Sequence, residues 1–277
     1  MPEITLGWVA FADLTWEPAA ISDPRSLSPR VRIAILASLT AALTTAALTL
    51  PSDSGAANSC FGRAATIVRG SGNDTIHGTA GSDVIVAGGG NDTVASGNGV
   101  DYVCGEGGND TIDTGNGDDF LDGGSGRDEL HGYNGGDRIV GRNGKDFLDG
   151  RRGEVGDVLI GGSGPDRMIG GERSIGGPGN DRMNGTGYVN DSHRDLLKGG
   201  PGSDQIAGDD SGQGRDLIRG GANADTLRGL SGRDRIFGNA GNDHLLGGPG
   251  NDDLDGGPDF DTCDQGPGTG TLANCEA

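Results

Sequence analysis

The sequence predicts an all-β fold in which short parallel strands and tight turns alternate and stack into a solenoid. Glycine makes up 58 of the 277 residues and aromatic residues only 4%, a composition far from that of an ordinary globular domain. An aspartate recurs from Asp74 to Asp261, and fifteen of its nineteen intervals are nine residues long. A repeat of fixed period indicates an architecture of stacked, equivalent units.

Two further rows of residues keep phase with the aspartates. Glycine lies two residues before the aspartate in sixteen of twenty repeats, as at Gly72, Gly90 and Gly117. An apolar residue lies two residues after each aspartate. This row consists of Ile76, Ile85, Val94, Val103, Ile112, Leu121, Leu130, Ile139, Leu148, Leu159, Met168, Met183, Leu197, Ile206, Ile218, Leu227, Ile236, Leu245, Leu254 and Cys263.

Each unit of nine residues is expected to form one turn and one strand. Glycine-rich segments adopt positive φ angles and turn the chain tightly, whereas the triplet around each apolar residue is a minimal strand whose central side chain faces inward. One unit cannot bury its apolar residue alone. Two units per coil, stacked about 4.8 Å apart, join the apolar rows into a continuous core and make the strands parallel.

Residues 1–57 are expected to form an N-terminal extension and a secretory signal peptide. Three arginines between residues 25 and 32 precede an uncharged, mostly apolar run over residues 33–50, which is the order of regions in such a signal. We favour cleavage after Ala57. The apolar run is also long enough for an uncleaved membrane anchor, and a chain that started near Val31 would carry a more compact signal.

The rest of the chain divides into a cap segment over residues 58–69, the repeats over residues 70–264 and a tail over residues 265–277. Four cysteines in a secreted chain indicate two disulfides, for which three connectivities exist. We favour Cys60–Cys104, which would fix the cap to an early coil, together with Cys263–Cys275, which would close the tail. No CxxC spacing supports a cysteine metal site.

The repeats include the blocks GGSGRDELH (Gly123–His131), GGSGPDRMI (Gly161–Ile169) and GGPGNDDLD (Gly247–Asp255). These blocks resemble the hemolysin-type calcium-binding repeat of RTX proteins, and the resemblance covers about residues 68–264. It implies a right-handed parallel β-roll, which is a β-helix-like solenoid with about 18 residues per coil and two short parallel sheets. It also implies calcium ions between successive loops on each edge.

The resemblance assigns the repeat aspartates as calcium ligands. Calcium prefers six to eight oxygens from carboxylates and backbone carbonyls, and a glycine turn closed by an aspartate offers both. Two loops one coil apart would share each ion, so alternate aspartates should line opposite edges. The expected edges begin with Asp74, Asp92, Asp110 and Asp128 on one side, and with Asp83, Asp101, Asp119 and Asp137 on the other.

The remaining expected ligands follow the same pattern to the end of the repeats. They are Asp146, Asp166, Asp181, Asp204, Asp216, Asp225, Asp234, Asp243, Asp252 and Asp261. Twenty loops divided equally between two edges leave at most roughly eighteen gaps for ions, and degenerate loops should lower the number to about ten to sixteen.

Two turns depart from the pattern and are expected to bind calcium weakly or not at all. They end at Asp157 and Asp195, where Val155 and His193 replace the glycine. Asparagine and aspartate replace it at positions 223 and 259, but both residue types tolerate the left-handed conformation. The longer intervals fall within residues 149–216 and are expected to bulge as surface loops while the stack continues.

The charge of the chain bears on its partners and on its folding. Asp and Glu number 41 against 21 Lys and Arg, for a net charge of −20, so the chain should repel nucleic acid and anionic membranes. Carboxylates stacked about 5 Å apart repel by on the order of 0.8 kcal/mol per neighbouring pair in bulk water. We therefore expect a chain without calcium to be disordered or partly formed, and calcium to fold it cooperatively.

The predicted function is that of a secreted, extracellular or cell-surface calcium-binding scaffold, monomeric, with no catalysis and no small-molecule substrate. The sequence contains no serine in a G-x-S-x-G context, no HExxH and no P-loop. The alternative is a calcium-dependent adhesin that binds a glycan, with Tyr133, Phe147 and Tyr188 as candidate contacts. A remote alternative is a non-catalytic fragment of a secreted enzyme. His77 and His131 are expected on outward, solvated strand positions.

Overall fold

The computed structural model describes residues 58–150, 156–185, 194–209 and 214–276. The expected signal segment within residues 1–57 lies outside these ranges. The described residues form strands and turns but no helix, and so none of them belongs to a helix that could span a membrane.

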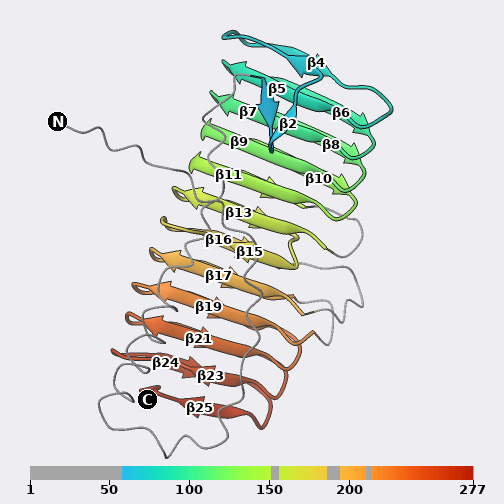
Figure 1. Ribbon diagram of the computed structural model, residues 1–277. Helices are drawn as coiled ribbons and strands as arrows, with labels where there is room; N and C mark the ends of the chain where they lie inside the picture. The colour runs from blue at the N-terminus through green and yellow to red at the C-terminus, as the bar shows by residue number, and fades with distance from the viewer. Residues whose placement is uncertain (1–57, 151–155, 186–193, 210–213, 277) are drawn as a thin grey trace, which may run out of the picture. The chain divides into compact units, whose positions relative to one another are not determined.

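Apart from a short hairpin, all strands belong to two parallel sheets that face each other (Figure 1). The twelve-stranded sheet consists, in spatial order, of β3 (Ile67–Val68), β5 (Val84–Gly89), β7 (Tyr102–Gly107), β9 (Phe120–Gly126), β11 (Arg138–Gly144), β13 (Val158–Ser163), β15 (Arg173–Ile175), β17 (Leu196–Pro201), β19 (Leu217–Ala222), β21 (Arg235–Ala240), β23 (Asp253–Asp255) and β25 (Thr271–Ala273). The eleven-stranded sheet consists of β4 (Thr75–His77), β6 (Thr93–Asn98), β8 (Thr111–Asn116), β10 (Glu129–Asn134), β12 (Phe147–Asp149), β14 (Arg167–Ile169), β16 (Arg182–Asn184), β18 (Gln205–Ala207), β20 (Thr226–Arg228), β22 (His244–Leu246) and β24 (Thr262–Asp264).

Consecutive strands alternate between the two sheets, so each coil contributes one strand to each sheet. Ile76 pairs with Val94 in one sheet, and Ile85 pairs with Val103 in the other, at the spacing of one coil. Hydrogen bonds between equivalent residues of the regular coils join positions eighteen apart in the sequence. The all-β parallel solenoid with about eighteen residues per coil is therefore confirmed.

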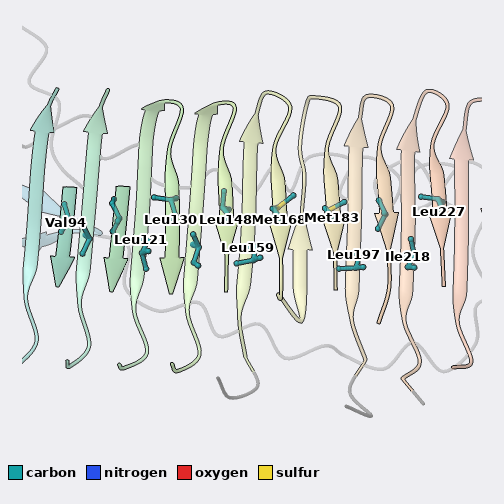
Figure 2. Packing of buried hydrophobic residues seen from close by; sticks show 14 of the residues in the cluster. Val94, Leu121, Leu130, Leu148, Leu159, Met168, Met183, Leu197, Ile218 and Leu227 are labelled. Atoms are coloured by element: carbon teal, nitrogen blue, oxygen red, sulfur yellow. The ribbon is translucent and has the colours of Figure 1, made fainter. Parts of the chain in front are cut away.

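The apolar row fills the space between the sheets. Every row residue from Ile76 to Leu254 is at most 2% exposed and belongs to one continuous cluster. Figure 2 shows part of this cluster, including Val94, Leu130 and Leu197, lying among the strands of the two sheets. Ile67 and Cys263 pack against the two ends of the cluster. The predicted core row is confirmed along its whole length.

One interval was interpreted wrongly from the sequence. The fourteen residues between Asp166 and Asp181 do not form a bulging loop, because they contain the additional strand β15, which pairs with β13 and β17. Glu172 takes the place of the repeat aspartate before this strand, and Ser174 lies 2% exposed in the apolar row. The stack keeps its two strands per coil here, and only the consensus residues are replaced.

Both ends of the solenoid are closed by a disulfide with the expected pairing. At the N-terminal end the antiparallel hairpin of β1 (Ser59–Cys60) and β2 (Arg63–Ala64) is joined to β7 by Cys60–Cys104. At the C-terminal end Cys263–Cys275 joins β24 to the tail. The tail also contributes β25, so the stack continues beyond the expected limit of the repeats at residue 264.

Candidate metal-binding edges

The turns between the sheets form two edges, each lined by aspartates. Turns that lead from the twelve-stranded to the eleven-stranded sheet end at Asp74, Asp92, Asp110, Asp128, Asp146, Asp166, Asp181, Asp204, Asp225, Asp243 and Asp261. Turns that lead in the other direction end at Asp83, Asp101, Asp119, Asp137, Asp157, Asp195, Asp216, Asp234 and Asp252. Alternation of the first eight aspartates is as expected, but the equal division of all twenty is wrong. Because the strand β15 is inserted between Asp166 and Asp181, these two aspartates lie on the same edge, and the later aspartates alternate from there. One edge therefore carries eleven aspartates and the other nine.

One oxygen of most of these carboxylates is used by the backbone. The Oδ1 atom accepts a hydrogen bond from the backbone N–H of the aspartate one coil earlier, for example over 2.8 Å from Asp92 to Asp110 and over 2.8 Å from Asp83 to Asp101. All of the edge aspartates except Asp74 are buried, with Asp101, Asp119 and Asp234 fully enclosed. An aspartate with such a bond connects its own turn to the preceding coil.

The second oxygen of most of these carboxylates has no donor among the described residues. The buried Oδ2 atoms concerned belong to Asp92, Asp101, Asp110, Asp119, Asp128, Asp137, Asp146, Asp166, Asp181, Asp204, Asp225, Asp234, Asp243, Asp252 and Asp261. A buried carboxylate oxygen without a donor or a cation is costly. A row of them indicates that the turns are built around a positively charged partner.

The surroundings of these Oδ2 atoms consist of further oxygen atoms. A Cβ placed on Gly105 would lie 2.4 Å from Oδ2 of Asp110 and 2.6 Å from the carbonyl oxygen of Gly123 in the next coil. These two oxygens are thus at most about 5 Å apart. Two oxygens that share one calcium ion, each at about 2.3 to 2.6 Å, are separated by no more than roughly 5 Å. Only glycine leaves this space open.

Two turns supply a donor to Oδ2 of the carboxylate from the chain itself. The backbone N–H and the hydroxyl of Thr79 donate to Oδ2 of Asp83 over 2.6 and 3.0 Å. The N–H of Asp209 donates to Oδ2 of Asp216 over 3.0 Å. These donors reduce the need for a cation at the two positions.

Burial raises the pKa of many of the edge carboxyls well above the ordinary value for aspartate. The pKa rises to about 6 at Asp110, Asp119, Asp204 and Asp243, to about 7 at Asp128, Asp137, Asp166, Asp181, Asp225 and Asp234, and to about 8 at Asp157. The backbone hydrogen bond to each carboxylate lowers the pKa, but burial outweighs it. In most of these turns neighbouring carboxylates raise the pKa further.

The donor set fits a hard cation. In the described part of the chain, no group of three or more His, Cys, Asp or Glu side chains is placed to hold one metal ion. Carboxylates alone therefore cannot complete a site, and backbone carbonyls of the glycine turns must supply the other ligands. A set of carboxylate and carbonyl oxygens suits calcium, whereas zinc prefers nitrogen and sulfur.

The irregular turns keep some of the expected features. Asn223 and Asp259 have φ angles of 80° and 91°, which confirms that they adopt the left-handed conformation in place of glycine. Asp157 and Asp195 are 4% and 5% exposed. Oδ1 of Asp157 accepts a hydrogen bond from the N–H of Asp137, and the N–H of Asp195 donates one to Oδ1 of Asp216. Val155 and His193 lie outside the described residues. Weak calcium binding at these two turns stays a prediction.

The two histidines of the early strands differ in their surroundings. His77 is exposed, as expected, but the prediction of a solvated His131 is wrong because this residue is only 8% exposed. The rings of Tyr133 and Phe147 each lie 5.8 Å from the His131 ring, and Nε2 of His131 lies 3.1 Å from a carboxylate oxygen of Glu129. Packing between neighbouring coils covers a position that looks exposed in the repeat pattern.

Comparison with known proteins agrees with this geometry. The family model of the RTX calcium-binding nonapeptide repeat (4 copies) matches residues 69–103, 105–130, 131–154, 153–172, 190–227, 210–236 and 228–263. Together these ranges cover more than half of the chain, and they leave out residues 173–189, where β15 lies. No curated protein matches the chain.

Proposed function

The chain belongs to the RTX calcium-binding nonapeptide repeat family, and from this premise we propose that it is an extracellular scaffold whose β-roll forms when calcium binds. The expected ligands are the repeat aspartates, together with carbonyl oxygens of the glycine turns. The observation that carries the proposal is the row of buried Oδ2 atoms without a donor. The proposed role requires no catalysis and no small-molecule substrate.

The charges on the edges support folding that depends on a cation. Neighbouring carboxylates of one edge raise each other's pKa, as Asp110 and Asp146 do for Asp128, so ionised side chains oppose the stacking of coils. Bound calcium would supply the positive charge that offsets this repulsion and satisfies the free oxygens. The apolar row does not itself require a cation, because its side chains form one continuous buried cluster.

Circular dichroism tests the dependence on calcium. The purified protein, stripped with a chelator, should give a weak β signal at neutral pH, and calcium should restore the signal in a cooperative transition. Magnesium at equal ionic strength serves as the control and should fail, because it demands a tighter octahedral geometry. A full β signal in excess chelator, unchanged by calcium, would contradict the proposal.

The two disulfides support the extracellular location, since disulfides persist in oxidising compartments. The sequence pattern over residues 1–57 supports it as well. Immunodetection of the protein in culture medium and in cell lysate, under non-reducing conditions, tests this part of the proposal. A reduced protein that stays inside the cell would contradict it.

Calcium-dependent glycan binding is the second candidate function, and a hollow of about 530 Å³ favours it. The hollow is lined by Phe237, Asn239, Ala240, Asp255, Gly257, Pro258 and Asn274. An aromatic ring beside a few polar groups is a common composition of ligand sites. The aromatic contacts expected from the sequence differ, since Tyr133 and Phe147 pack on His131 and Tyr188 lies outside the described residues.

A glycan array with and without calcium tests this candidate. Binding should require calcium and should be lost in Phe237→Ala. Phe260→Ala is the matched control, because Phe260 is 61% exposed and does not line the hollow. An array without any calcium-dependent signal would leave the scaffold role as the sole proposal.

A further inference from the structure

The two edges of the solenoid differ in regularity. On the edge that begins with Asp74, which we call the regular edge, the hydrogen bond from each aspartate N–H to the next Oδ1 continues without a break from Asp74 to Asp261. Glu276 accepts the N–H of Asp261 over 2.6 Å and ends the series. Every turn of this edge is thus linked to both of its neighbours.

The other edge, which we call the interrupted edge, lacks one turn of this kind. The turn between β14 and β15 consists of three residues, Gly170, Gly171 and Glu172, and Glu172 stands at the position of the aspartate. A regular turn, such as the one from Gly132 to Asp137, has five residues before the aspartate. The short turn lacks the aspartate and three of the five loop residues before it. It keeps one carbonyl oxygen near a carboxylate, because a Cβ on Gly150 would lie 3.0 Å from the carbonyl oxygen of Gly170 and 2.6 Å from Oδ2 of Asp157.

The hydrogen-bond series of the interrupted edge breaks at the short turn. It runs from Asp83 to Asp157 and resumes from Asp195 to Asp252. Among the described residues, no carboxylate accepts the backbone N–H of Asp157, whereas the N–H of Asp137 donates to Asp157 over 2.8 Å. The strand pairing itself is unbroken, because β15 pairs with both β13 and β17.

The gap is too wide for a shared cation. The turns of Asp157 and Asp195 are two strand spacings apart, which is roughly 9.6 Å in a parallel sheet. A calcium ion holds its oxygens at about 2.3 to 2.6 Å and therefore cannot connect turns at this separation. The carboxylate of Glu172 is close enough to Asp157 to raise its pKa, which adds repulsion to the missing ligands.

We infer that the chain holds calcium in three rows instead of two. One row follows the whole regular edge, and the interrupted edge carries two independent rows, from Asp83 to Asp157 and from Asp195 to Asp252. This inference rests on the proposed function, since it assumes that the turns bind calcium. It means that the short turn at Glu172 leaves incomplete two sites that a uniform stack would have, one on each side of β15.

Rebuilding the turn tests the inference. In the rebuilt variant, Gly170–Gly171–Glu172 is replaced by Gly-Gly-Ser-Gly-Pro-Asp, the sequence of the turn that ends at Asp166. The matched control has the same length but Asn in place of the final Asp. Calcium bound per chain, measured by equilibrium dialysis with atomic emission, should rise by two ions in the rebuilt variant and not in the control.

The possible outcomes separate the inference from the proposed function. If the wild-type protein binds calcium but the rebuilt variant gains no ion, the three-row arrangement is wrong and the proposed function stands. If the wild-type protein binds no calcium, both fail. Equal gains in the rebuilt variant and the Asn control also overturn the inference, because the added carboxylate would then play no part.

A second measurement avoids any change in chain length. Asp137→Asn and Asp234→Asn lie on opposite sides of the short turn, and Asp146→Asn and Asp243→Asn lie the same number of coils apart on the regular edge, which is continuous between them. The shifts in calcium midpoint should add for the first pair, because no row connects them, and should deviate from additivity for the second. Equal deviation in both pairs overturns the inference.

Discussion

Most repeat aspartates place their two carboxylate oxygens in different environments. Oδ1 is held by the N–H of the preceding coil, as Oδ1 of Asp128 is held by Asp110 over 2.9 Å. Oδ2 faces glycine and carbonyl oxygen and has no donor. The first oxygen requires only an acceptor, whereas the second requires a cation, so substitution by asparagine separates the two roles.

Asp128→Asn should therefore have opposite effects with and without calcium. Burial raises the pKa of Asp128 to about 7, so at pH 8 the metal-free protein carries a buried charge that the amide removes. We expect the variant to be more stable than the wild type in chelator, and less stable by about 1 to 3 kcal/mol in saturating calcium. Asp118→Asn, at an exposed position, is the control. The β signal in circular dichroism measures the effect in chelator and thermal unfolding measures it in calcium, and a change in the same direction in both contradicts the prediction.

The glycine that faces the carboxylate should tolerate no side chain. A Cβ on Gly161 would lie 2.5 Å from Oδ2 of Asp166 and 2.8 Å from the carbonyl oxygen of Gly176. We expect Gly161→Ala to cost about 1 to 3 kcal/mol in calcium, as overpacking does in cores. Gly81→Ala is the matched control, because the nearest atom to its Cβ would be 3.9 Å away. Similar melting temperatures for the two variants would show that this space is not confined.

At the scale of the strand, the apolar position sets the structure more firmly than the aspartate does. Every residue of the apolar row from Ile76 to Leu254 lies in the core. The reason is that successive side chains of a strand point to opposite faces, and the central side chain of each triplet points inward. The strand β15 was missed because Glu172 and Ser174 replace both residues on which recognition of the repeat depends. Ile175 and the glycines on either side of the strand were its remaining signals.

Side chains on the outer face of a strand were harder to predict. The repeat pattern gives the direction of His131 but not the identity of its neighbours in other coils. Tyr133 and Phe147 cover it, and Phe147 reaches it from β12. Similarly, stacking of Tyr102 on Phe120, with ring centroids 4.7 Å apart, depends on which residues the eighteen-residue spacing brings together.

The hairpin of β1 and β2 should depend strongly on its disulfide. Cys60–Cys104 closes a sequence separation of 44 residues and Cys263–Cys275 one of 12. Chain entropy predicts a loss of about 4 kcal/mol on removing the first and about 3 kcal/mol on removing the second. Thermal unfolding of the paired Cys→Ser variants in calcium measures the difference. A larger loss from the C-terminal pair would contradict this order.

At the scale of the whole molecule, the raised pKa values link stability to pH. A carboxyl with a pKa of about 7 in the folded chain and about 4 in the unfolded chain binds more protons when folded between these two values. The free energy of unfolding of the metal-free protein therefore falls as pH rises through this window. Acid should favour the metal-free solenoid.

Circular dichroism in chelator at several pH values checks this dependence. The β signal should grow as pH is lowered from 8 to 5, in the range where the carboxyls gain protons. In saturating calcium the same change should weaken the solenoid, because protons compete with the ion for the carboxylates. A β signal in chelator that falls on acidification would contradict the prediction.

The pairing of each strand with strands one coil away also has a mechanical consequence. A pull on the two termini loads the coils in series, so the solenoid should unwind one coil at a time instead of breaking at once. Eighteen residues released from one coil lengthen the tether by roughly 55 Å. The Cys60–Cys104 and Cys263–Cys275 bridges hold the coils together at the two ends of the solenoid, so unwinding should start in the coils between them. If calcium stabilises the coils as proposed, the molecule would act as an extensible tether whose force threshold rises with the calcium concentration around it.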